Sequence, residues 1–202
     1  ASFVELFRLK AGTLQDRPIS DVKTSFEDTL ARRTFDESGD YVIKPFQLEL
    51  REHLDILETD SFSHSKEHSI EVQIPMLQEV FSDKMKILPI SLINQEQKTA
   101  TLVGSAIAKI AQKKDALLIG SSDFTHYEEN GFAYSQDQAL IDPILKLDVD
   151  EFYKILYERK VTACGFGAIA SIMTACKELG ATQGKLLKYA TSGDVSGDKS
   201  SV

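Results

Sequence analysis

The stretch Leu117-Leu118-Ile119-Gly120-Ser121-Ser122-Asp123-Phe124-Thr125-His126 decides the expected fold and holds the best candidate for a functional site. A short apolar run passes into Gly-Ser-Ser and then Asp-Phe-Thr-His. This order is typical of a buried strand that ends at the polar edge of an α/β sheet. Asp123 and His126 lie three residues apart, so both side chains can face one pocket. A carboxylate beside an imidazole can fix its tautomer and take part in acid–base catalysis. An isolated Asp-x-x-His can equally be a turn cap beside a hydrogen-bonded histidine.

The composition is that of a soluble globular protein with a single domain over residues 1–202. Of its residues 42% are apolar and 27% charged, and the net charge is -8. The acidic balance argues against nucleic acid and membrane surfaces as partners. No apolar run approaches the ~20 residues of a membrane span, and the N-terminus does not look like a secretory signal. Cys164 and Cys176 would be about 18 Å apart on one helix, too far for a disulfide, so we expect a cytoplasmic protein.

The hydrophobic pattern predicts strands that alternate with helices. The expected strands are 41–50, 86–92, 117–121 and 185–190. The expected helices are 20–30, 51–58, one that follows a cap at Ser65 and kinks or begins anew just before Pro75, 99–113, 132–147, 150–159 and 165–179. Gly180 should end the last of them. This alternation predicts an α/β fold with a mixed sheet covered by helices on both faces.

Three further segments carry residues suited to chemistry. His68 and Glu71 have helical i, i+3 spacing, which allows a shared metal or a hydrogen-bonded pair, although His68 could also be satisfied by the backbone at a helix start. Cys164 opens a helix, where the dipole favours a thiolate, but most lone cysteines serve packing. Asp194 and Asp198 follow the last expected strand, where a carboxylate could reach the sheet edge or the turns could simply connect to another strand.

In their order and separation these motifs resemble the Memo family. The resemblance covers about residues 37–202, and residues 1–36 match nothing in the family. The segments that carry it are Glu67–Pro75, Gly120–Tyr127, Ala163–Gly167, and Tyr189–Asp194 continuing to Val202. The family is similar in fold to class III extradiol dioxygenases, which hold non-haem iron with two histidines and a carboxylate. The resemblance therefore implies an extradiol-dioxygenase-like fold.

The resemblance also assigns roles to residues of this chain. It implies that the catalytic residues are Asp123, His126 and His68. It implies Asp194 as a metal ligand, with Asp198 as the alternative. The remaining pocket residues would be Glu71, Ser122 and Cys164. The family places its metal histidines further upstream, yet residues 1–52 contain no histidine. We therefore expect a fold that lacks part of the N-terminal half and an incomplete site that binds iron or another divalent metal weakly or not at all.

Two functions follow from this interpretation. The first is metal-dependent chemistry in a His/Asp-lined cleft that His68, Asp123, His126 and the 191–198 loop would share, with Cys164 near its wall. The alternative is a non-enzymatic protein that uses the same cleft to bind a peptide, a small anion or a partner protein. A phosphate-binding module fits less well, because no glycine-rich loop follows a strand. Enzyme status, the ligand and a homo-oligomeric state are left open.

Overall fold

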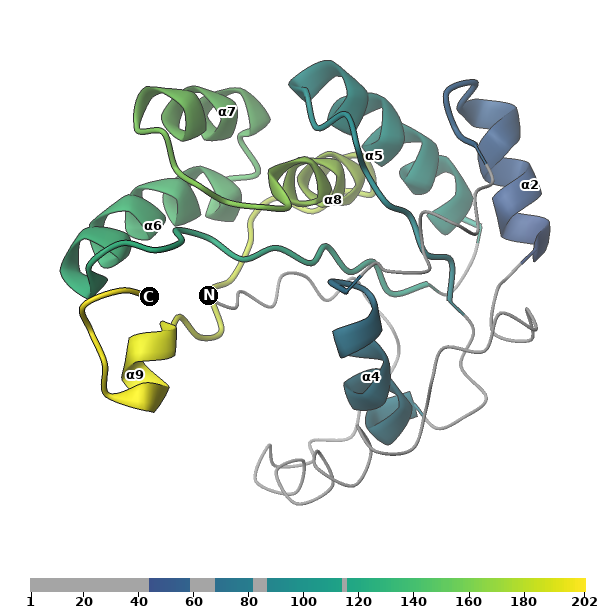
Figure 1. The fold of residues 1–202 in the computed structure, drawn as a ribbon. Helices are drawn as coiled ribbons and strands as arrows, with labels where there is room; N and C mark the ends of the chain where they lie inside the picture. The colour runs from purple at the N-terminus through teal and green to yellow at the C-terminus, as the bar shows by residue number, and fades with distance from the viewer. Residues whose placement is uncertain (1–43, 59–67, 82–86, 114–115) are drawn as a thin grey trace. The chain divides into compact units, whose positions relative to one another are not determined.

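The computed structural model describes residues 44–58, 68–81, 87–113 and 116–202 (Figure 1). The chain divides into two compact units at residue 91, and each unit is described by itself. The expected helix at 20–30 and the cap at Ser65 lie outside the described residues. A single domain over residues 1–202 stays a prediction.

The described part of the first unit contains two α-helices and a 3-10 turn: α2 (Lys44–His53), η2 (Glu71–Gln73) and α4 (Ile74–Phe81). The predicted strand at 41–50 is wrong where it is described, because α2 occupies residues 44–50. Pro45 misled the prediction: it falls in the first turn of α2, where a missing N–H breaks no intrahelical hydrogen bond. The helix expected at 51–58 ends at His53. The new start just before Pro75 is confirmed, since α4 begins at Ile74.

The described part of the second unit, Leu92–Val202, contains five helices. They are α5 (Gln97–Ala111), α6 (Asn130–Leu145), α7 (Val149–Glu158), α8 (Phe166–Glu178) and α9 (Ser192–Ser196). The first four confirm predicted helices to within a few residues. Local signals set their ends: the Glu129 and Asp148 side chains cap α6 and α7, and Gly180, at φ +94°, follows α8. The short helix α9 lies where a loop was expected.

Helix α8 is the centre of the second unit (Figure 1). It contacts α5 and α7, and α6 in turn contacts α7. The approach to α5 is close at Gly104, because a Cβ there would collide with the Ser171 carbonyl and lie 2.7 Å from the Thr174 Cβ. Apolar side chains of α6, α7 and α8 fill the core, among them Leu140, Ile144, Phe152, Leu156, Ile169 and Met173.

The predicted mixed sheet is wrong: the described residues contain helices and no strand. Residues 87–92, 116–121 and 185–190 form no regular element. The side chains of Leu117 and Ile119 are 45% and 44% exposed, so this run is covered on one side only. The covered side meets a helix, since a Cβ at Gly120 would lie 2.9 Å from Ile172 of α8. A pattern in which apolar and polar residues alternate predicts an extended chain with one buried face. A strand also needs a neighbouring backbone to complete its ladder, which a local pattern does not provide.

None of the described helices is long and apolar enough to cross a membrane.

Candidate functional site

The segment that carries Asp123 is fastened to the loop before α8 by reciprocal hydrogen bonds. The Cys164 N–H donates to the Asp123 carbonyl at 3.1 Å, and the Asp123 N–H donates to Cys164 Sγ at 3.3 Å. Ser122 Oγ accepts from the Gly165 N–H at 2.9 Å and donates to the Asp123 carbonyl at 2.8 Å. A Cβ at Gly165 would collide with the Ser121 carbonyl. Glycine at position 165 is therefore what lets the two segments approach.

A second fastening comes from Gln95, in the loop before α5. Its amide nitrogen donates to the Cys164 carbonyl at 2.9 Å, and its amide oxygen accepts from the Gly167 N–H at 2.8 Å. Tyr153 Oη donates to the Gln95 carbonyl at 2.6 Å. Because Gly165, the N-cap residue of α8, has no side chain, Gln95 takes over part of the capping from a distant loop. Sequence reasoning missed Gln95, since nothing local distinguishes it from a surface glutamine.

His126 is held by Thr162, which precedes Cys164 in the same loop. The His126 N–H donates to Thr162 Oγ1 at 2.8 Å, and the ring Nδ1 lies 2.9 Å from the Thr162 carbonyl oxygen. A carbonyl oxygen only accepts, so Nδ1 carries a proton in this hydrogen bond. In the neutral imidazole Nε2 is then unprotonated, and it lies 3.8 Å from Asp123 Oδ2. No sequence pattern pointed to Thr162, because the atom that sets the tautomer is its backbone carbonyl oxygen.

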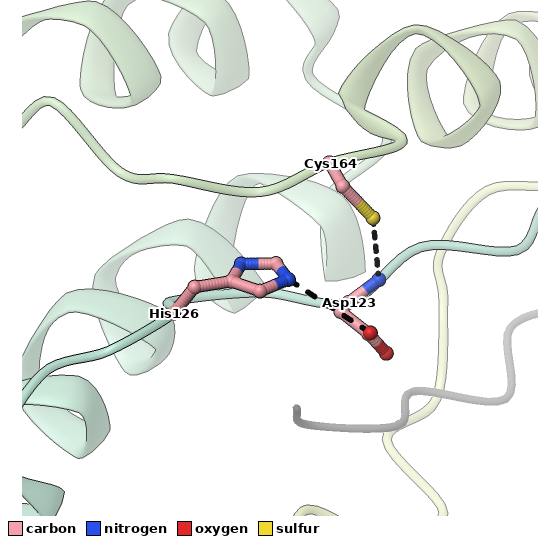
Figure 2. Close-up of side chains that lie close together, drawn as sticks. All are labelled: Asp123, His126 and Cys164. Atoms are coloured by element: carbon pink, nitrogen blue, oxygen red, sulfur yellow. Dashed lines mark hydrogen bonds and ion pairs between the residues drawn. The ribbon is translucent and has the colours of Figure 1, made fainter. Parts of the chain in front are cut away.

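Asp123, His126 and Cys164 meet at one place (Figure 2). Each offers one ligand atom, and these three atoms all lie within 4.8 Å of one another. The Asp123 and His126 side chains are 33% and 24% exposed, and Cys164 is exposed, so the cluster opens to solvent. Asp123 and His126 lie close together, as their spacing in the sequence predicted. Cys164 is 41 positions further along the chain than Asp123, after α6 and α7, and the fold brings it to the same place.

The types of ligand atom in the cluster suit the group that the resemblance implied, a divalent metal ion. Oxygen, nitrogen and sulfur ligands suit zinc, iron or copper better than magnesium or calcium. Metal–ligand bonds of about 2.0–2.3 Å place tetrahedral ligand atoms roughly 3.3–3.8 Å apart. The 3.8 Å between His126 Nε2 and Asp123 Oδ2 is already at that spacing. Metal-binding histidines also tend to donate their other ring N–H to a carbonyl, as His126 does to Thr162.

Asp194, the metal ligand implied by the resemblance, has other partners. It is the third residue of α9, and its Oδ2 accepts from the Thr191 N–H at 2.9 Å and from Tyr134 Oη at 2.7 Å. The Thr191 N–H, followed by the Tyr134 hydroxyl, lowers the pKa of the Asp194 carboxyl below its ordinary value. Asp198 accepts from the backbone and hydroxyl of Ser200, which lower its pKa in the same way. Neither belongs to the three-residue cluster, and a metal role for either stays a prediction.

His68 and Glu71 belong to the first unit, so a cleft shared with the cluster stays a prediction. The His68 side chain is exposed, and its carbonyl accepts from the Val72 N–H at 3.2 Å. Glu71 is the first residue of η2. Ser122, predicted as a pocket residue, lies beside the cluster and uses its hydroxyl to hold the backbone of Asp123 and Gly165.

Comparison with known proteins identifies the family. A family model described as Memo-like protein matches residues 41–202. A MEMO1 family protein of Nitrosopumilus maritimus is 62% identical over 146 residues, which are 72% of this chain and 53% of that relative. A MEMO1 family protein of Methanosarcina acetivorans is 49% identical over 73% of this chain and 56% of its own length. One of Sulfolobus acidocaldarius is 42% identical over 77% of this chain and 55% of its own length.

The chain is thus a helical protein, in its described part, with a cysteine, a histidine and an aspartate gathered at one exposed site. It belongs to the Memo family. The chain spans about half the length of the curated relatives that it matches.

Proposed function

We propose that this Memo family chain holds a divalent metal ion at the Asp123–His126–Cys164 cluster, in a site related to those of non-haem metal-dependent dioxygenases. The observation that carries the proposal is the hydrogen bond from His126 Nδ1 to the Thr162 carbonyl at 2.9 Å. It leaves Nε2 with a free lone pair on the side where Asp123 and Cys164 lie. This donor set differs from the one expected from the resemblance, which implied Asp194 as the metal ligand, Asp123 and His126 as catalytic residues and Cys164 as a pocket residue.

Each residue of the cluster has a separate task. Cys164 supplies the soft ligand that favours zinc, iron or copper, and the Asp123 N–H donates to its sulfur. His126 supplies nitrogen, with its ring orientation fixed by Thr162. Asp123 supplies oxygen and can also accept a proton from a group bound beside it. A bound divalent ion would supply Lewis-acid polarisation of a substrate oxygen, and iron would in addition supply redox chemistry.

The site should bind its ion weakly. Only three protein ligands converge, and all three are partly or fully accessible to water, which competes for the ion. Weak binding agrees with the expectation drawn from the sequence, which stays a prediction.

A cobalt titration tests the proposal. Co²⁺ is added to protein stripped of metal with a chelator, and thiolate-to-cobalt absorption is recorded. We expect saturation at one equivalent, and loss of the bound ion on dialysis against a mild chelator. Cys164→Ala should abolish the thiolate band, and His126→Ala should weaken binding at least tenfold. Cys176→Ala is the matched control: Cys176 is buried in α8, and burial raises the pKa of its thiol to about 11.

The control variant should retain the full cobalt spectrum. If wild-type protein gives no thiolate band, or if Cys164→Ala keeps it, the metal proposal is wrong. The non-enzymatic binding protein would then be the better interpretation.

A further inference from the structure

A buried carboxyl group lies behind the cluster and takes no direct part in it. Asp137, on α6, is 0% exposed. Its Oδ1 accepts from the Thr125 N–H at 3.0 Å and from Thr125 Oγ1 at 2.5 Å. Its Oδ2 accepts from Tyr189 Oη at 2.6 Å. An aspartate without these partners would be costly to bury, so the three hydrogen bonds explain how the core tolerates it.

The same bonds fix the residue next to His126. Thr125 is itself 2% exposed, and both its backbone and its hydroxyl are bound to Asp137. On the other side, His126 is bound through its backbone and its ring to Thr162. Hydrogen bonds therefore hold Thr125 to α6 and His126 to the loop before α8.

We propose that Asp137 is a positioning residue for the cluster, acting through Thr125 to hold His126 with Nε2 directed at Asp123. The inference rests on the proposed function for its purpose, since an oriented Nε2 matters only if that nitrogen binds an ion or takes a proton. The orientation itself can be observed without any metal.

The physical reason lies in how a hydrogen bond fixes a ring. The bond from Nδ1 to the Thr162 carbonyl survives only while the backbone of residue 126 stays within reach of that oxygen. Two hydrogen bonds from Thr125 to Asp137 restrain the chain immediately before it, and a third, from Tyr189, holds the Asp137 carboxylate in place. Without them the backbone at Thr125 can move. His126 then loses both its fixed tautomer and its place beside Asp123.

The first measurement is nuclear magnetic resonance of the histidine ring nitrogens in metal-free protein, with the His126 signal assigned by its loss in His126→Ala. In the wild type at pH 8, Nδ1 should carry the proton and Nε2 should be bare. In Asp137→Ala we expect a mixture of both tautomers. In Asp137→Asn the tautomer should be kept, because the amide oxygen can still accept from Thr125.

Gln136→Ala is the matched control. Gln136 neighbours Asp137 on α6 and is 8% exposed. Its side-chain hydrogen bonds go to Arg159, whose carbonyl accepts from the amide at 2.8 Å, and not to Thr125. Its removal should cost stability but leave the His126 tautomer unchanged. If Gln136→Ala and Asp137→Ala disturb His126 equally, or if neither does, Asp137 is a core residue without a positioning role.

The second measurement is the cobalt titration of the same variants. Asp137→Ala should weaken binding about tenfold to a hundredfold, the range typical of residues that orient a ligand, whereas Gln136→Ala should change it less than about twofold. If wild-type protein binds no cobalt, the proposed function fails while the tautomer measurement still tests the positioning. Should Asp137→Ala not fold, Thr125→Val removes the 2.5 Å hydroxyl bond alone and is expected to shift the tautomer in the same direction.

Discussion

At the scale of single residues, Asp194 has a structural role that the sequence analysis did not predict. The carboxyl follows a Gly in a polar stretch, which suggested a ligand at the rim of a sheet. In the structure the same position is the third residue of α9, where a carboxylate can accept from the backbone N–H of Thr191 at the cap. A metal ligand and a helix cap both need an exposed carboxylate at the start of an element. The sequence pattern therefore does not distinguish the two roles.

The hydrogen bonds to Asp194 predict a dependence of stability on pH. The Thr191 N–H and the Tyr134 hydroxyl lower the pKa of the folded carboxyl below its ordinary value of 3.8. Its contribution to stability is therefore fully present above about pH 4 and is lost as the pH falls through the lowered folded pKa. Asp194→Asn should lower the melting temperature at pH 7 and lower it less at pH 2.5. Melting curves at both pH values check this. A deficit of the same size at both would show that the charge of Asp194 is irrelevant.

At the scale of elements, the contact between α5 and α8 depends on a missing side chain. Gly104 sits where a Cβ would meet backbone of α8, which cannot move aside as the end of a flexible side chain can. A helix-forming pattern alone would accept alanine here, and gain by it. The tertiary contact reverses that preference.

Gly104→Ala should therefore destabilise the protein by about 1–3 kcal/mol, the usual cost of overpacking a core. Urea unfolding measures the change. Gly131→Ala in α6 is the control, because its Cβ would meet only the flexible Glu129 carboxylate, at 3.1 Å. That variant should be neutral or slightly stabilising. A gain in stability for Gly104→Ala would mean that helix propensity, and not the α5–α8 contact, governs position 104. Equal losses in the two variants would likewise contradict the role given to that contact.

At the scale of the whole molecule, the extended segments 116–121 and 185–190 expose apolar side chains to solvent. Leu117 and Ile119 are nearly half exposed and Leu187 is 64% exposed. Extended segments with apolar side chains toward water favour association with another chain. We expect self-association at micromolar concentration, measured by sedimentation velocity, and Ile119→Lys should shift the distribution toward monomer.

Ile93→Lys serves as the control for this prediction. Ile93 is 93% exposed in a loop, so the substitution adds the same charge away from the extended run. It should leave the sedimentation distribution unchanged. A compact monomer at every concentration, or an equal effect of both substitutions, would contradict the role given to residues 117–119.

The sequence by itself determined what is local in this protein. Each helix is specified by residues within it or next to it. These are its periodic apolar residues, the caps at Glu129 and Asp148, and Gly180 after the end of α8. The proximity of Asp123 and His126 is local in the same sense, because three residues of chain separate them. The motifs also sufficed to identify the Memo family.

Only the tertiary structure decided which distant groups meet. Cys164 reaches Asp123 across 41 positions, and Gln95 reaches Cys164 across 69. The extended runs illustrate the same limit: their apolar alternation predicted strands, but a strand exists only when another backbone completes its hydrogen bonds, and here a helix covers the run at Gly120. Hydrogen bonds between remote segments depend on packing of the whole unit, and no window of sequence contains both partners.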